Sequence, residues 1–227
     1  MKTRFHWMAL CAGLATAPAW ADHPLVSETA DALPRGSCQV EFARATEHTQ
    51  KQPMTGSSDV QFSCGAGARS QFAIGMNSAR VQGRRVEQYR AAGKTTLLEP
   101  SNGQTGFGVR YGLTWATGLG LSTELESSTI MAVATREVRN GVLVHANLGF
   151  SRDRQRALSM GLWSLGVETT DALAFAADVY GEERGKPSLS LGVGWRAMKD
   201  MNISLAYAMQ TGDDKTKTLS LGLKLVF

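Results

Sequence analysis

The last thirteen residues of the chain, KTKTLSLGLKLVF (residues 215–227), alternate between apolar side chains and small or polar ones. Successive side chains of a β-strand point to opposite faces, so this alternation predicts a strand with one entirely apolar face. The apolar face ends on an aromatic residue at the last position of the chain. Its members are Leu219, Leu221, Leu223, Leu225 and Phe227.

The same two-residue period recurs along most of the chain. It is clear in GFGVRYGLTWATG (106–118), VLVHANLGF (142–150), ALAFAADVY (172–180), SLSLGVGWR (188–196) and MNISLAYAMQ (201–210). Turn-like segments rich in Gly, Pro, Asn, Asp or charge separate the runs. These segments are 48–57, 65–69, 78–84, 99–105, 117–120, 136–141, 151–156, 167–171, 181–187, 197–200 and 211–217. The pattern predicts twelve strands of about ten residues, the length of a tilted β-span of a bilayer. Alternation is weakest in 85–98 and 157–166.

A soluble β-sandwich would alternate as well, but two features favour a closed transmembrane barrel. The polar face is mostly Gly, Ala, Ser, Thr and Asn, whereas a water-facing sheet usually carries many Lys, Glu and Arg residues. The apolar face carries almost no charge, as expected where Arg or Lys costs about 2–4 kcal/mol at the bilayer midplane. Aromatic residues near strand ends fit interfacial girdles: Phe107, Trp115, Phe150, Trp195 and Phe227. We therefore predict an all-β, closed antiparallel barrel over residues 37–227.

A final strand that alternates and ends on Phe resembles the signal by which the barrel-assembly machinery recognises outer-membrane barrels. The even strand number returns both termini to one side, as in single-chain outer-membrane barrels. The sequence therefore predicts a location in the outer membrane of a Gram-negative-type envelope.

The chain begins with features of export. Lys2 and Arg4 precede the apolar stretch 5–20, and Ala19-Trp20-Ala21 is a cleavage-like triplet, so residues 1–21 are predicted to be a cleaved signal peptide. Residues 22–36 are then expected to form a periplasmic extension. Removing Lys2 and Arg4 from the 24 basic residues leaves 22 against 20 acidic ones, and this near-balance gives no indication of nucleic-acid binding.

Two cysteines, Cys38 and Cys64, remain after cleavage. Oxidising compartments favour disulfides, and a hairpin centred near residue 51 places Cys38 opposite Cys64, Val40 opposite Phe62 and Phe42 opposite Val60. We predict a disulfide between the two cysteines, the alternative being a pair of reduced thiols. No metal or cofactor is expected, because His23 and His48 lack ligand spacing around them.

Several stretches together resemble a known family. They are VLVHANLGFSRDR (142–154), WSLGVE (163–168), ADVYGE (177–182), PSLSLGVGWR (187–196), ISLAYAM (203–209) and the terminal LGLKLVF. The chain resembles the small outer-membrane barrels of the meta-pathway phenol-degradation family, described as transporter-like. Asp178 stands where that family usually has Glu. The resemblance implies uptake of small hydrophobic or aromatic compounds, and it supplies no catalytic residues.

If alternation assigns the faces, the lumen contains ionisable and polar side chains of both signs. The candidates for lumen or selectivity residues are Arg90, Lys94, Arg110, Glu124, Glu126, His145, Asn147, Asp178, Tyr180, Arg196 and Lys224, with Asn202 and Gln210 on the same face. Buried charges need partners or water. The candidates form either a salt-bridge network that braces a closed barrel or a polar constriction that selects a solute.

The leading functional prediction is a narrow outer-membrane pore or facilitator for small molecules. The alternative is a structural or interaction barrel with a salt-bridged, closed lumen. An outer-membrane acyl hydrolase using His145 is a distant third, because GLWSLG (161–166) is not a nucleophile elbow. Expected partners are outer-membrane lipids and lipopolysaccharide. The charged loops, including Arg152, Arg154 and Arg156, form either a solvated rim or a contact with lipopolysaccharide phosphates.

Overall fold

Alternating apolar and small side chains produce twelve strands in the described part of the chain. The computed structural model describes residues 25–49, 52–67, 69–81, 84–101, 103–118, 121–153, 158–212 and 216–227. The strands are β1 (Cys38–Thr49), β2 (Gln52–Gly65), β3 (Ser70–Val81), β4 (Arg84–Leu98), β5 (Gly106–Gly118), β6 (Leu121–Arg139), β7 (Val142–Asp153), β8 (Leu158–Thr169), β9 (Leu173–Glu182), β10 (Ser188–Met198), β11 (Met201–Gln210) and β12 (Thr216–Val226).

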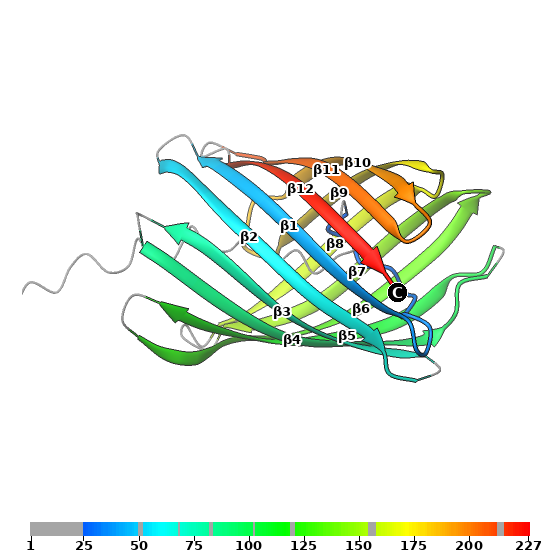
Figure 1. Cartoon of the computed structure of the whole chain (residues 1–227), viewed down its shortest axis with the longest axis horizontal. Coiled ribbons are helices and arrows are strands. Elements are labelled where there is room, and N and C mark those ends of the chain that lie inside the picture. Colours follow the sequence, from blue (N-terminus) through cyan, green and yellow to red (C-terminus); the bar gives the residue numbers. More distant parts are fainter. Residues whose placement is uncertain are drawn as a thin grey trace, which may run out of the picture.

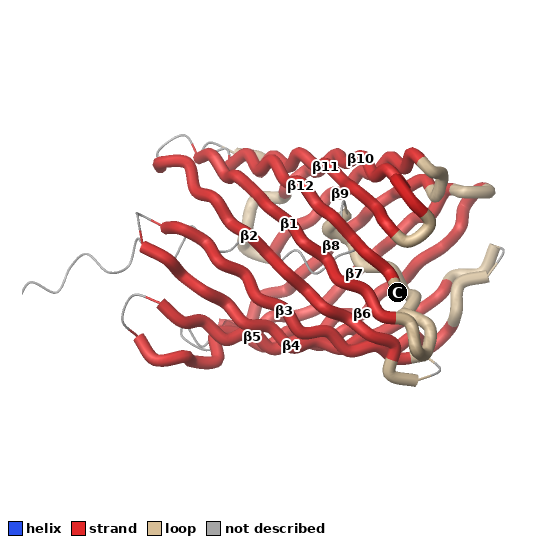
Figure 2. The backbone as a smooth tube through the Cα atoms, in the orientation of Figure 1, coloured by secondary structure: helices blue, strands red, loops and turns tan. Residues whose placement is uncertain are grey.

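Each strand pairs with its neighbours in sequence, and β1 pairs with β12, so the sheet closes into a barrel (Figure 1). All the pairings are antiparallel, and the strands run obliquely around the barrel (Figure 2). The prediction of a closed twelve-stranded antiparallel barrel is therefore confirmed, including the weakly alternating strands β4 and β8. No helix of the described residues is long and apolar enough to cross a membrane.

Most turns are shorter than the sequence predicted. The first was expected over 48–57, yet β1 runs to Thr49 and β2 begins at Gln52. The ladder continues there because strand pairing depends on backbone hydrogen bonds, which polar side chains such as Ser57 and Ser58 do not interrupt. The end of apolar alternation therefore marks the end of the apolar belt, not the end of the strand.

The outer wall is apolar and exposed. Large side chains such as Leu148 (68% exposed), Leu191 (66%) and Phe150 (64%) point away from the barrel axis. Exposing so much contiguous apolar surface to water is unfavourable by roughly 25 cal/mol per Å². The outside of this barrel is therefore suited to lipid, as the sequence predicted.

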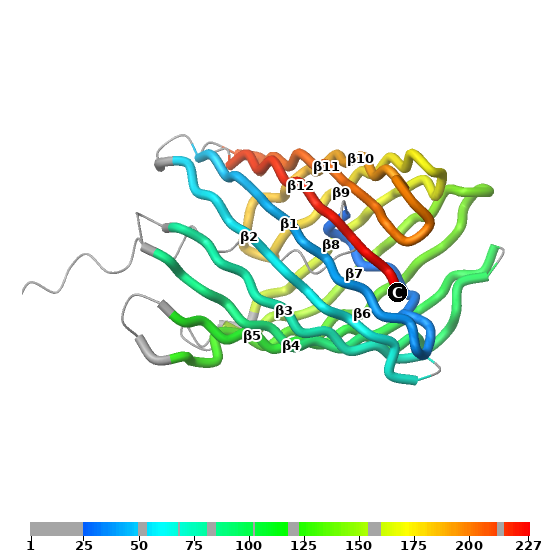
Figure 3. The backbone as a smooth tube through the Cα atoms, in the orientation of Figure 1, coloured from blue at the N-terminus to red at the C-terminus, as the bar shows by residue number. Residues whose placement is uncertain are grey.

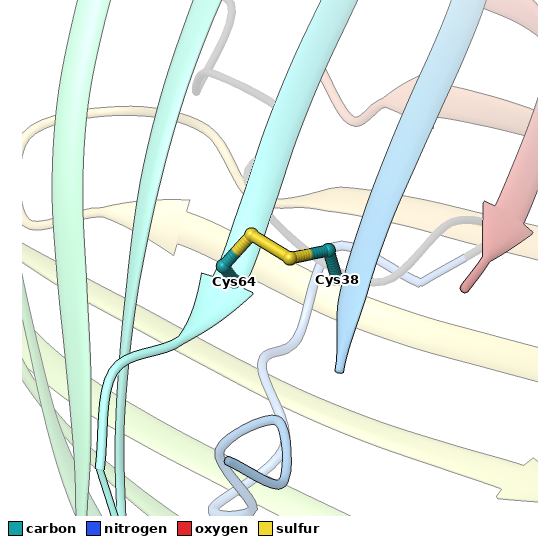
Figure 4. The surroundings of a disulfide bond; sticks show 2 residues. All are labelled: Cys38 and Cys64. Carbon is teal, nitrogen blue, oxygen red and sulfur yellow. A yellow bond between two sulfur atoms is a disulfide. The ribbon is translucent and has the colours of Figure 1, made fainter. Parts of the chain in front are cut away.

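The two cysteines are bonded to one another, which confirms the predicted disulfide. Cys38 at the start of β1 lies opposite Cys64 near the end of β2, in the register expected from the sequence. Figure 4 shows the bond joining the two strands beside the end of β12. The covalent link thus lies next to the pairing of β1 with β12 that closes the barrel.

The C-terminal residue completes that closure. The Phe227 N–H donates to the Cys38 carbonyl (2.8 Å), and the Cys38 N–H donates to the Phe227 carbonyl (2.7 Å). Leu219, Leu221 and Phe227 are exposed on the outer wall, as their alternation predicted. Their role as an assembly signal remains a prediction.

Replacing both cysteines by serine is expected to lower the free energy of unfolding by about 3 kcal/mol, because the bond closes a loop of 26 positions in the unfolded chain. Urea unfolding of the refolded protein would measure the loss. Reduced wild-type protein is the control and should match the double variant. Equal urea midpoints for the oxidised wild type and the variant would contradict the expectation.

Candidate functional site in the lumen

The N-terminal segment lies inside the barrel. The sequence predicted a periplasmic extension over 22–36, whereas residues 25–34, here called the lumen segment, run along the inner wall (Figures 1 and 3). Leu25, Ser27 and Ala30 are at most 2% exposed. In solvent, water would satisfy the backbone N–H groups of this segment. In the lumen, side chains of the barrel wall take the place of water, so the segment can be buried there. Residues 1–24, including the predicted signal peptide, lie outside the described residues.

Wall side chains satisfy the backbone of the lumen segment at its N-terminal end. The carboxylate of Asp178 on β9 accepts from the N–H of Val26 (3.0 Å) and from the N–H of Ser27 (3.1 Å). On β6, the Thr135 hydroxyl accepts from the N–H of Ala30 (2.8 Å). The segment is thus fixed by its backbone groups on the β6–β9 side of the barrel.

The β3–β4 part of the wall holds the C-terminal half of the segment in the same way. The Thr96 hydroxyl on β4 accepts from the Ala32 N–H (2.9 Å) and donates to the Ala30 carbonyl (2.8 Å). Gln71 on β3 accepts from the Leu33 N–H (2.7 Å). Together with the Glu28 N–H, which bonds to Asn147, six backbone N–H groups of the segment therefore bond to wall side chains, and none of these bonds belongs to the strand ladder.

Glu28 supplies the charge of the lumen segment. Its carboxylate lies 3.3 Å from Lys94 Nζ on β4 and 3.4 Å from Arg110 Nε on β5. The side chains of Glu28 and Lys94 are about 95% buried, and that of Arg110 is 12% exposed. With its amide oriented to satisfy both groups, Asn147 on β7 accepts from the Glu28 N–H (2.6 Å) and donates to its carbonyl (3.2 Å).

Three lumen-facing glycines make room for the segment. A Cβ on Gly166 of β8 would lie 2.7 Å from Ser27 Oγ, and one on Gly108 of β5 would lie 3.0 Å from the Ala30 carbonyl oxygen. At Gly65 of β2 a Cβ would collide with the Pro34 carbonyl. With the contacts above, the segment touches the eight consecutive strands β2 to β9.

Other predicted lumen residues form pairs within the wall. Arg90 on β4 pairs with Asp59 on β2, and Asn77 of the strand between them also donates to Asp59 (3.3 Å). On the neighbouring strands β12 and β1, Lys224 lies 3.8 Å from Glu41. These pairs resemble the predicted bracing network, because each bridges strands of the same wall.

Glu126 reaches the lumen through an irregularity in the sheet. The register between β5 and β6 shifts at Thr114 and Trp115, which leaves Glu126 without a residue directly opposite. Gln88 Nε2 donates to its carboxylate (2.8 Å). Beyond the shift Glu124 pairs with Ala116 and is exposed.

The remaining candidates lie away from the lumen segment. Arg196 is exposed near the end of β10, and Tyr180 is half-buried opposite Ser188. Asn202 and Gln210 are half-buried on β11. The structure therefore brings together Lys94, Arg110, His145, Asn147 and Asp178 around the segment, and it leaves the other candidates outside that group.

His145 is enclosed beside the segment. It is 0% exposed, its Nδ1 lies 3.0 Å from Thr135 Oγ1, and its Nε2 lies 3.2 Å from Glu168 Oε1, outside hydrogen-bond geometry. Thr135 can accept from Ala30 and donate to Nδ1, so this histidine orients a wall residue that holds the segment. Within the described residues no serine is hydrogen-bonded to it, and no group of His, Cys, Asp and Glu side chains is arranged to hold a metal.

A small polar cavity adjoins the Glu28 carboxylate. About 20 Å³ is available to the centre of a water molecule, enough for a single water or two. Its lining includes Gln61, Gln71, Lys94 and Arg110 together with Glu28. Thr135 and Asn147 beside the segment are at most 4% exposed, and Ser190 and Ser204 on the far strands are buried as well. The lumen is thus filled at the level of the segment.

Sequence reasoning identified Lys94, Arg110, His145, Asn147 and Asp178 on the wall of this site. It missed Gln71, Thr96 and Thr135, which hold the segment by hydrogen bonds, and it missed Glu28 and the lumen segment itself. VSETADALP (26–34) does not alternate and has no helical period, so it gives no signal of structure. The inward glycines at 65, 108 and 166 were the available indication, because small residues on one face leave space for another chain segment.

The closed sheet, the exposed apolar exterior and the polar interior define this protein as a small β-barrel of the outer-membrane type. More specifically, the chain belongs to the family described as uncharacterised conserved protein UCP029691, which it matches over residues 8–227. The predicted resemblance to a transporter-like family is confirmed in its coarser part, that the chain is a small outer-membrane barrel. No curated protein matches the chain.

Solved structures show the same fold at low sequence identity. An outer membrane channel described as COG4313 from Pseudomonas putida F1 has a TM-score of 0.60 and 10% identity, covering 87% of this chain and 97% of that one. The KdgM porin has a TM-score of 0.59 and 8% identity, covering 82% and 99%. Outer membrane phospholipase A from Escherichia coli has a TM-score of 0.55 and 10% identity, covering 90% and 93%. At these identities the likeness concerns the fold alone.

Proposed function

We propose that the protein is an outer-membrane channel for small molecules whose lumen is closed by its own N-terminal segment. The observation that carries the proposal is what fills the lumen. A structural barrel of this size could fill its lumen with side chains of its wall, yet here a separate ten-residue segment occupies it. All the strand pairings lie within residues 38–226, so the ladder is complete without the segment.

The segment is held by contacts that can be reversed. Hydrogen bonds to wall side chains and the ion pairs of Glu28 hold it in the lumen, and all of these contacts lie outside the strand ladder. Release would expose the lumen without breaking the barrel.

The test is the conductance of two refolded chains in a planar bilayer. One chain begins at Asp22, and the other begins at Arg35, which keeps the Arg35–Gly65 bridge and Cys38. We expect steady openings from the shorter chain and long closed periods from the longer one. A heat-modifiable gel band shows that each chain is folded. A folded shorter chain that never opens would overturn the proposal.

The structural barrel remains a second candidate because wall-to-wall pairs such as Arg90–Asp59 brace the lumen independently of the segment. It predicts that the shorter chain is silent and that neutralising Arg90 lowers stability with no transport phenotype.

Similarity to channels and to a phospholipase does not decide between transport and catalysis. We infer transport because the enclosed His145 offers no reaction centre open to a lipid.

The transported class is proposed from the resemblance noted in the sequence. Small hydrophobic or aromatic compounds are the solutes that this resemblance implies. The lumen itself is polar, so such a solute would also need a polar group to pass the level of the segment.

A further inference from the structure

Glu28 places a carboxylate where two basic wall residues meet. Its Oε2 faces Lys94 Nζ at 3.3 Å, and its Oε1 faces Arg110 Nε at 3.4 Å. Each carboxylate oxygen of Glu28 thus faces one cation, and the two cations lie on the neighbouring strands β4 and β5. In the ladder Lys94 and Arg110 lie directly opposite each other, so the two positive charges share one face. Like charges in that position repel one another unless an anion lies between them.

Lys94 depends on the lumen segment for its contacts. Within the part of the chain that the structure describes, its two hydrogen-bond partners are Glu28 Oε2 at 3.3 Å and Thr29 Oγ1 at 3.4 Å, and both belong to that segment. A buried ammonium group without a counter-charge is strongly unfavourable. When the segment leaves, Lys94 and Arg110 both lose the Glu28 carboxylate, and the wall then favours another anion at the same place.

The surroundings leave room for more than a carboxylate. The cavity beside Glu28 is lined by the amides of Gln61 and Gln71 and by the small side chains of Ala73 and Ala92. Gln61 is 7% exposed, and among the described residues its Oε1 has no hydrogen-bond partner in the closed state. Departure of residues 28–33 enlarges this space next to the two cations, with an amide oxygen ready to accept a hydrogen bond.

We propose that Lys94 and Arg110 form a binding site for the carboxylate group of a small organic solute, and that Glu28 is an internal substitute for this solute. The inference rests on the proposed function, because a solute reaches the site only when the lumen segment is displaced. It narrows the solute class to carboxylates, which bond to Lys and Arg through short, charge-assisted hydrogen bonds.

Benzoate and its neutral isostere benzamide provide a direct test on the chain that begins at Arg35. We expect benzoate to block the conductance with at least about ten-fold higher affinity than benzamide, because only benzoate can form charge-assisted bonds to both cations. Lys94→Gln and Arg110→Gln should each remove that preference. Arg136→Gln, on the exposed outer side of β6, is the matched control and should retain it.

The proposal is overturned if benzoate and benzamide block equally, or if the preference for benzoate survives both lumen substitutions. If the shorter chain does not conduct, the proposed function fails, and the site is tested by binding instead. An end-blocked peptide of residues 25–34 should bind the shorter chain, benzoate should compete with it, and its Glu28→Gln form should bind at least about ten-fold more weakly. A peptide that binds equally with Gln at position 28 would overturn the site independently of conductance.

Discussion

A full-length chain carrying Gly166→Val is expected to conduct as the chain lacking the lumen segment does. Gly166 faces the lumen on β8, and a Cβ there would lie 2.5 Å from Asp178 Oδ1, 2.7 Å from Ser27 Oγ and 2.9 Å from Ser27 Cβ. Valine adds two further carbons, so the Asp178 carboxylate and Ser27 must both move, which breaks the bonds that hold this end of the segment while the strand ladder keeps its register. Overpacking costs about 1–3 kcal/mol, which lowers the equilibrium ratio of docked to released segment by about 5- to 150-fold.

Single-channel recording in a planar bilayer measures this effect as open probability. Gly161→Val is the matched control on the same strand, because a Cβ at Gly161 meets Glu183 only at an ordinary 3.5 Å. The control should open as rarely as the unmodified chain. If both valine variants remain closed, although a heat-modifiable band shows that they are folded, the segment is not what closes the lumen.

Gly149→Val is expected to prevent refolding of the barrel. A Cβ at Gly149 of β7 would collide with the Ile130 carbonyl oxygen and would lie 2.7 Å from the Met131 Cα, both in the backbone of β6. Backbone atoms of a paired strand cannot move aside as the end of a side chain can. Valine would therefore have to separate β6 from β7, and the cost of several kcal/mol is comparable with the whole stability of a small domain.

The yield of heat-modifiable protein after refolding into detergent micelles measures this effect. Gly56→Val is the control, since a Cβ at Gly56 on β2 would meet no atom of the described residues within 4 Å. It should refold as well as the unmodified chain. Refolding of Gly149→Val at the yield of this control would show that β6 and β7 are not in close contact at this point.

The barrel was predictable from the sequence because lipid and lumen impose opposite preferences on alternate residues. Leu189, Leu191 and Val193 on β10 show this alternation directly, and the cysteine register followed from simple hairpin pairing. Strand ends were less predictable, since pairing continues past the apolar belt. Glu126 illustrates a further limit, because the register shift in β6 depends on local backbone geometry that a two-residue period cannot reveal.

The site was predictable only on the wall. Lys94, Arg110, Asn147 and Asp178 were identified because alternation places them inward. Their partners in the lumen segment were not, since that segment is recognised mainly through its backbone N–H groups. Every residue except proline carries such a group, so the side-chain sequence holds little record of this binding.

The closure at Cys38 has a consequence for the order of biogenesis. The two cysteines are close in sequence and lie on adjacent strands, so oxidation can join β1 to β2 while the other strands are still unpaired. The last strand to arrive then meets an edge that is already held in shape, where Phe227 pairs with Cys38. Because only residues 35–37 separate the lumen segment from Cys38, its attachment point is fixed at the same early step.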